Sequence, residues 1–290
     1  MLDFVQQLVS GVALGCVYGL IALGFVLVYK ATEVVNFAQG DLMMLGGFFA
    51  FTFIGMMGLN YWIGFAGAVA AMALFGMLAE RVVVRPILGY PQFSIIMATI
   101  GLGYFLRSVA GMVWGTDDFK IDTPFSQGVL RIGSLVLAFD KLSVIAATII
   151  LCTLLWLFFN KTTLGTAMRA SSENMLAAYY MGIPVKRLNG LVWGLAAAVA
   201  SVAGLLLAPI TFVHANMGFI GLKAFPAAVV GGFGSLPGAI VGGLVIGIVE
   251  SLSGFYLPEG FKDIAAYIVV LLMLMVKPNG LFGDKLRKKV

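Results

Sequence analysis

Apolar stretches long enough to cross a lipid bilayer follow one another along nearly the whole chain. A membrane-spanning helix needs about 20 apolar residues, and in lipid only helices and closed barrels pair every backbone hydrogen-bonding group. With 61% hydrophobic and 11% charged residues, the chain carries more apolar surface than a soluble core can bury. The sequence therefore predicts an all-α polytopic membrane protein that forms a single transmembrane domain over residues 1–290.

The spacing of the apolar stretches predicts about eight or nine transmembrane helices, with the N-terminus outside the cell and the C-terminus inside. Glycine and proline interrupt the stretch 219–254, so we expect a Gly/Pro-broken segment near 225–240. The basic loop at 161–187 and the basic tail at 278–290 belong on the cytoplasmic side, so 219–254 should cross twice. The other expected spans are 8–29, 37–58, 61–80, 92–114, 141–160, 188–210 and 263–277.

Most of the 18 Lys and Arg residues fall on the side of the membrane that we assign to the cytoplasm. They are spread over short loops and helix ends rather than gathered in one patch, so we expect no nucleic-acid partner. The longest external loop, about 115–140, lies on the other side. Its alternating residues Val129, Arg131, Gly133 and Leu135 indicate a small β-hairpin. This loop is either an outward platform for a partner protein or a plain connector.

The longest polar interruption of the chain, 161–187, lies between two strongly apolar segments. Ser171 and Ser172 are good helix N-caps, and Gly182 followed by Pro184 stops a helix, so we expect a helix of about two to three turns outside the bilayer. The helix either docks against another protein or rests on the lipid headgroups, and both interpretations are open. Its apolar side chains are too many for a solvated linker: Met175, Leu176, Tyr179 and Met181.

Three segments of the chain together carry a family resemblance. The segment Ala177-Ala178-Tyr-Tyr-Met-Gly182-Ile183 resembles the cytoplasmic coupling loop of ABC importer permeases, whose pattern is Glu-Ala-Ala-x-x-x-Gly. Leu176 stands where that pattern has its acid, and Glu173 comes about one turn earlier. With VVNFAQGDLMMLGGFFA near the start and AFPAAVVGGFGSLPGAIVGGLVIGIVE near the end, nearly the whole chain resembles the permeases of the branched-chain (hydrophobic) amino-acid ABC uptake family, of the Liv type.

The resemblance implies the membrane subunit of a bacterial inner-membrane importer for branched-chain or related small amino acids. It also implies a second homologous permease chain, two cytoplasmic ATPase subunits that would bind ATP and Mg²⁺, and a periplasmic substrate-binding protein. This chain itself would bind no cofactor. The residues expected to couple ATP hydrolysis to transport are Arg169, Glu173, Ala177, Ala178 and Gly182.

Two groups of residues are candidates for the translocation path. Asn36, Gln39 and Asp41 stand at the start of the second expected span, where the resemblance favours the path and simple helix capping is the alternative. Exposed backbone of the Gly/Pro-broken segment would line the path at Gly231, Gly232, Gly234 and Pro237, and a simple kinked hairpin without function is the alternative.

Arg107 and Glu250 lie inside expected spans, where charged side chains are costly and should face protein or water. Each is about 20 Å from the cytoplasmic start of its helix at 1.5 Å per residue. The similar depths favour an ion pair between them. Otherwise each side chain reaches the outer interface or pairs locally.

Glycines recur at every fourth position in two places, at Gly11, Gly15 and Gly19 and again from Gly234 through Gly238 to Gly242, with Gly243 and Gly247 following. On a helix this spacing makes a smooth strip that another helix backbone can approach closely. We interpret the strips as helix-packing surfaces, with pore lining as the alternative.

The sequence contains no pattern that indicates an enzyme or a metal site. It lacks the G-x-x-x-x-G-K-[ST] phosphate loop, H-E-x-x-H and clustered His or Cys residues, and its two cysteines lie in separate apolar runs. A stand-alone channel or ion-coupled carrier is the alternative function, although a carrier would favour a mid-membrane acid or histidine or an inverted repeat. Within the importer interpretation, urea, short amides and other amino acids are further possible substrates.

Overall fold

The computed structural model describes residues 2–125, 128–132 and 135–283, which form a helical bundle with one small hairpin. Six helices are long and apolar enough to cross a membrane, among the residues described. They are α1 (Leu2–Thr32), α3 (Tyr61–Ala79), α4 (Gln92–Trp114), α5 (Phe139–Lys161), α8 (Val185–Thr211) and α10 (Leu236–Tyr256). The prediction of an all-α polytopic membrane protein is confirmed.

Three further apolar helices are shorter, and they correspond to the remaining expected spans. They are α2 (Gln39–Ala50), α9 (Gly218–Gly231) and α11 (Phe261–Val276). The helix α2 continues as a π-helical turn over Phe51–Met56, just as α3 continues over Glu80–Val84 and a 3₁₀ turn over Arg85–Ile87. The expected break in 219–254 is present, because a four-residue turn separates the short α9 from the longer α10.

The helix α1 lies near the middle of the bundle, and its glycine strip packs against α10. A Cβ atom on Gly15 would lie only 2.8 Å from the carbonyl oxygen of Gly243, and one on Gly11 would lie 2.9 Å from Ile248 Cα. Gly19 likewise approaches Ile240 Cα. The expectation that glycines at every fourth position pack helices together is therefore confirmed. Gly11, Gly15 and Gly19 approach α10, whereas Gly238 and Gly242 approach Gly231 at the end of α9.

The loop between α4 and α5 contains the expected hairpin. Strands β1 (Val129–Ile132) and β2 (Leu135–Ala138) pair antiparallel, with Val129 opposite Ala138. Gly133, part of the alternation that predicted the hairpin, lies outside the described residues. Earlier in the loop, Phe119 and Val213 exchange backbone hydrogen bonds of 2.9 and 2.8 Å, which joins this loop to the turn after α8.

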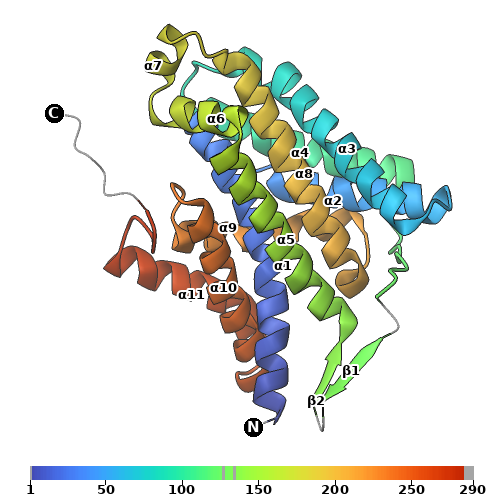
Figure 1. Cartoon of the computed structure of the whole chain (residues 1–290). Coiled ribbons are helices and arrows are strands. Elements are labelled where there is room, and N and C mark those ends of the chain that lie inside the picture. Colours follow the sequence, from blue (N-terminus) through green and yellow to red (C-terminus); the bar gives the residue numbers. More distant parts are fainter. Residues whose placement is uncertain (1, 126–127, 133–134, 284–290) are drawn as a thin grey trace.

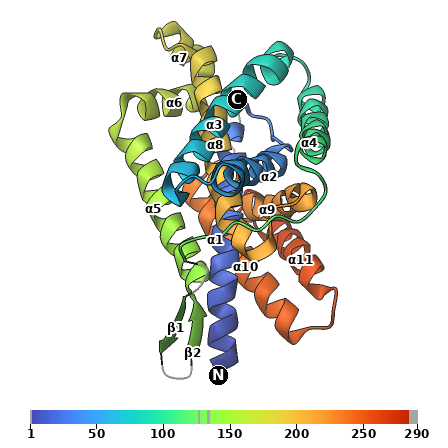
Figure 2. The same ribbon diagram turned by 90° about the vertical axis from the view of Figure 1, so that its right-hand side faces the viewer.

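The two ends of the molecule differ. The N-terminus and the hairpin lie at one end, and two short helices, α6 (Thr163–Glu173) and α7 (Met175–Tyr180), lie at the other (Figure 1). Seen from the side, α5 lies on the opposite face of the bundle from α4, α9 and α11 (Figure 2). In this view the hairpin projects at one end of the bundle and the α6–α7 pair at the other.

Candidate functional site

The polar interruption forms two helices instead of the single one expected. Thr162 Oγ1 accepts a hydrogen bond of 3.0 Å from Gly165 N and caps α6, while Asn174 Oδ1 accepts one of 2.9 Å from Ala177 N and caps α7. The assignment of Ser171 and Ser172 as N-caps is wrong, since both lie in the last turns of α6. A cap needs extended backbone, which the chain adopts at Thr162 and Asn174.

The helix α6 packs tightly against the end of α5. Arg169 donates hydrogen bonds to the carbonyl oxygen of Phe159 and to Asn160 Oδ1. A Cβ atom on Gly165 would lie 2.6 Å from Phe159 Cα, so only glycine permits this approach. Because the last carbonyl groups of a helix have no partner within it, Arg169 pairs one of them and fixes α6 on α5.

The helix α7 presents apolar side chains outward. Tyr180 and Met181 are each 83% exposed, whereas Ala178 on the inner side is buried. Gly182 ends the helix with φ +81°, a left-handed conformation that favours glycine. Among the expected coupling residues, Glu173 and Ala177 are also exposed, at the junction of α6 and α7.

The side chain of Arg85 joins the start of α8 to the turns that continue α3. The buried Glu80 carboxylate accepts hydrogen bonds of 3.1 and 2.6 Å from Nε and Nη2 of Arg85, and Arg85 Nη2 also donates one of 3.0 Å to the carbonyl oxygen of Lys186. The two-pronged geometry is the strong form of an arginine–carboxylate interaction. Both ends of the 161–187 loop are therefore joined to long helices by arginine side chains.

The polar residues at the start of α2 lie inside the protein. Asn36 and Gln39 are fully buried. Asn36 Oδ1 accepts a hydrogen bond of 3.0 Å from Ala38 N, and Gln39 Nε2 donates one of 3.2 Å to the carbonyl oxygen of Ala196 in α8. These contacts fix the α1–α2 turn against α8, and a role in translocation remains a prediction.

Arg107 forms an ion pair with Asp41, at 2.8 Å between Nη2 and Oδ1. The guanidinium group also lies over the Phe219 ring, 3.8 Å from its centroid. Gly103 in α4 and Gly218 in α9 stand against the Asp41 carboxylate, where any side chain would collide with it. The pair therefore joins α2, α4 and α9.

The predicted ion pair between Arg107 and Glu250 is wrong. Glu250 Oε1 lies 3.8 Å from Lys223 Nζ in α9, and Lys223 also pairs with Asp263 at the start of α11. The second carboxylate oxygen of Glu250 is buried and has no hydrogen-bond partner within the described part of the chain. Similar depth in two helices did not bring the two side chains together, because depth says nothing about which way a helix face points.

The glycines of the broken segment are packed against other backbone. A Cβ atom on Gly231 would lie 2.8 Å from Ala239 N, and one on Gly232 would lie 2.7 Å from Gly283 N. Leu281 and Phe282 donate backbone hydrogen bonds to the last carbonyl groups of α9. The start of the C-terminal tail therefore covers this turn, while residues 284–290 of the predicted basic tail lie outside the described residues. Gly234 and Pro237 lie in the same turn and at the start of α10, and the path assignment of all four positions remains a prediction.

Comparison with known sequences identifies the family. The sequence model of the branched-chain amino acid transport system permease component matches residues 7–276. The chain belongs to this family. The permease is 34% identical to the high-affinity branched-chain amino acid transport system permease protein LivH of Salmonella typhimurium, an alignment that covers 100% of this chain and 98% of LivH.

A second relative agrees with this assignment, and a solved structure shares the fold. The permease is 32% identical to the high-affinity permease protein BraD of Pseudomonas aeruginosa, over 99% of this chain and 98% of BraD. It also resembles the solved structure of PsaBC from Streptococcus pneumoniae in complex with Fab, with a TM-score of 0.51 and 18% identity over 96% of this chain and 92% of that one. That similarity concerns the fold alone. The permease is a transport subunit, and ATP hydrolysis lies on separate partner subunits.

Sequence reasoning missed three charged residues of this permease: Glu80, Lys223 and Asp263. Two of them carried a signal in the sequence. Glu80 lies at the end of an apolar span and five positions before an arginine, and Lys223 interrupts an apolar segment. A charge in such a place needs a partner. The partners of Lys223 could not be read from the sequence, because they lie on other helices.

Proposed function

We propose that this permease is the membrane-spanning subunit of a bacterial ATP-driven importer that carries branched-chain or related small amino acids across the inner membrane. The names of its full-length relatives support this substrate class. The observation that supports coupling most directly is α7, a short helix with exposed apolar side chains at the end of the molecule opposite the N-terminus (Figure 1). An exposed apolar helix of this kind suits a groove on a partner protein.

The contacts of the 161–187 loop suggest how force on α7 reaches the bundle. Two cytoplasmic ATPase subunits, which bind ATP and Mg²⁺, press on α7 of this chain and on its counterpart in a second permease chain. Arg169 transmits the displacement to α5, and the contact between Arg85 and the Lys186 carbonyl transmits it to α3 and α8. The helices then rock between inward-open and outward-open states, and a periplasmic binding protein delivers the amino acid at the opposite end.

The composition of the complex tests this proposal first. The permease is extracted from its native membrane in mild detergent, with and without crosslinking, and the co-purifying proteins are identified by mass spectrometry. Two nucleotide-binding subunits and a second permease chain are expected. Recovery of the crosslinked chain alone would contradict the importer and favour a stand-alone channel or carrier.

Substitutions on α7 test the coupling step. Met181→Asp places a charge at an exposed apolar position and should abolish association with the ATPase subunits. Thr166→Asp places the same charge at an exposed position on α6 and should not. Gly182→Val strains the left-handed turn and should leave ATP hydrolysis but abolish uptake in proteoliposomes. Normal uptake by both Met181→Asp and Gly182→Val would show that α7 has no role in coupling.

A further inference from the structure

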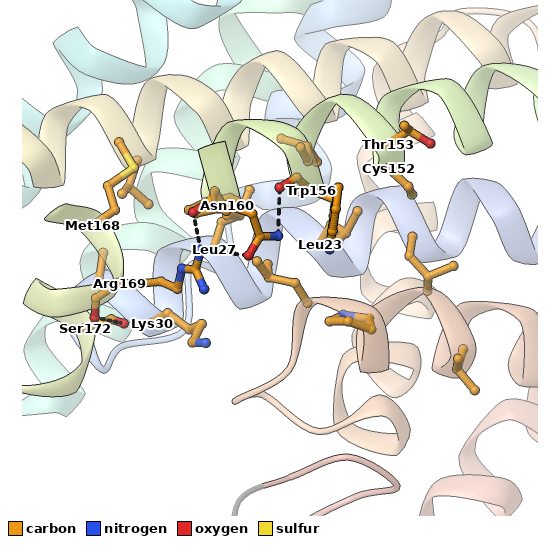
Figure 3. A pocket seen from close by; sticks show the side chains of 18 residues that line it. Leu23, Leu27, Lys30, Cys152, Thr153, Trp156, Asn160, Met168, Arg169 and Ser172 are labelled. Atoms are coloured by element: carbon orange, nitrogen blue, oxygen red, sulfur yellow. Dashed lines mark hydrogen bonds between the residues drawn. The ribbon is translucent and has the colours of Figure 1, made fainter. Parts of the chain in front are cut away.

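A largely apolar cavity of about 690 Å³ lies between α1, α5, α6 and α10 (Figure 3). Its walls are formed by apolar side chains of these helices, among them Leu23, Leu27, Leu155 and Ile240. Along α5 the lining extends from Cys152 to Asn160, or about 12 Å at 1.5 Å per residue. The cavity therefore has the length for a stretch of hydrocarbon chain.

The two charged residues of the cavity, Lys30 and Arg169, lie at the end formed by α6, together with Asn160 and Ser172 (Figure 3). Lys30 makes no hydrogen bond or ion pair within the described part of the chain, and its ammonium group is available. Arg169 uses Nη2 for its contacts with α5, which leaves further N–H groups for a ligand. No Asp or Glu stands among the described residues that line the cavity, so this end attracts an anion.

The cavity borders a surface that faces away from the bundle. Trp156, which lines it, is 58% exposed, and Ile149, Ile150 and Leu154 on α5 are also exposed. In a membrane protein, such an apolar helix face lies in the hydrocarbon region, and tryptophan is enriched near the headgroups. The cavity is thus positioned to admit a lipid from the leaflet beside α6.

We propose that this cavity binds an anionic phospholipid, with an acyl chain between α1, α5 and α10 and the phosphate at Lys30 and Arg169. A transported amino acid fits less well, because its ammonium group would find no carboxylate among the lining residues. Basic pockets between helices on the cytoplasmic side commonly bind lipid headgroups. A phosphate at Arg169 would also brace α6 against α5, next to the loop to which we assign coupling.

Lipid retention by the isolated full-length permease tests this proposal, so the outcome does not depend on the ATPase partners. The purified protein is incubated with phosphatidylglycerol or phosphatidylcholine of identical acyl chains, and bound lipid is counted by native mass spectrometry. Phosphatidylglycerol should be retained preferentially, and Lys30→Gln should weaken its retention about fivefold, which corresponds to ~1 kcal/mol for one basic residue near a lipid surface. Lys186→Gln removes an equal charge outside the cavity and should have no effect.

Two further variants separate the headgroup contact from the chain contact. Val241→Trp narrows the cavity with both charges intact and should reduce retention of phosphatidylglycerol to the level of phosphatidylcholine. Equal retention of the two lipids by the unmodified chain, or no effect of either Lys30→Gln or Val241→Trp, would overturn the proposal. So would efficient crosslinking of an Ile149→Cys variant to a second permease chain, because that face would then be a protein interface.

Discussion

The ion pair between Asp41 and Arg107 is the interaction at the residue scale with the largest expected energetic effect. The side chain in Asp41→Asn has the same shape as aspartate and fits the space beside Gly103 and Gly218. The substitution leaves the guanidinium group of Arg107 without its counter-charge. Breaking a buried pair from one side costs about 3–5 kcal/mol, whereas replacing both partners costs much less. We expect Asp41→Asn to lower the thermal unfolding temperature in detergent and Asp41→Asn with Arg107→Gln to recover most of the loss. Additive losses in the double variant would contradict this interpretation.

The pair between Glu80 and Arg85 should matter for transport more than for folding, because it contacts the backbone at the start of α8. Arg85→Lys retains the charge but loses the two-pronged contact and the hydrogen bond to the Lys186 carbonyl, which together contribute on the order of 1.5–3 kcal/mol. We expect uptake in proteoliposomes to fall several-fold with the amount of assembled complex unchanged. The control is Arg81→Lys, since Arg81 is exposed and lies next to Glu80 in the sequence. Equal uptake by the two variants would show that the contact has no role in transport.

The sequence predicted which charged residues lie within the membrane-spanning region better than it predicted their interaction partners. The sequence singled out Asp41, Arg107 and Glu250; the structure buries Asp41 and Glu250 and partly buries Arg107. Counting residues along a helix gives the height of a side chain but not the direction in which it points. Arg107 therefore finds its partner on α2, while Glu250 faces Lys223 on α9.

At the scale of the helices, local signals predicted the long elements well and the short ones less well. Apolar length located every long helix, and the period-2 alternation located the hairpin. The division between α6 and α7 was missed because several residues in a row can cap a helix, and only the backbone geometry selects Thr162 and Asn174. The glycine strips were predicted as packing surfaces, but the sequence did not show that α1 and α10 are each other's partners.

The packing of α1 on α10 gives a prediction at this scale. Gly243→Ala places a methyl group against the backbone of Gly19, and Gly15→Ala places one against Gly243, so either should destabilise the fold by about 1–3 kcal/mol. Gly111→Ala in α4 is the matched control, because nothing lies within 4 Å of its added Cβ atom and alanine favours a helix. Thermal unfolding followed by size-exclusion chromatography in detergent measures the difference. Equal unfolding temperatures for the three variants would show that α1 and α10 do not pack closely at Gly15 and Gly243.

At the scale of the whole molecule, the separation of the two ends decides how the fold can work in transport. The loop between α4 and α5 and the N-terminus lie at one end, and α6 and α7 lie at the other (Figure 1). Under the positive-inside rule, the basic residues around 161–187 predict that the second end lies in the cytoplasm. Delivery of a solute from outside and force from ATPases inside would then act on opposite ends of the same long helices, α5 and α8.

Cysteine accessibility tests this orientation. In a background of Cys16→Ala and Cys152→Ala, a membrane-impermeant maleimide added to intact spheroplasts should label Lys120→Cys in the external loop and spare Glu173→Cys at the end of α6. Disruption of the membrane should make Glu173→Cys reactive, because its side chain is exposed in the fold. Ala68→Cys is buried and should remain unlabelled in both conditions, which separates protection by the protein from protection by the membrane. Labelling of Glu173→Cys in intact spheroplasts would place α7 outside the cell, where no ATPase could reach it, and would leave the coupling proposal without a physical basis.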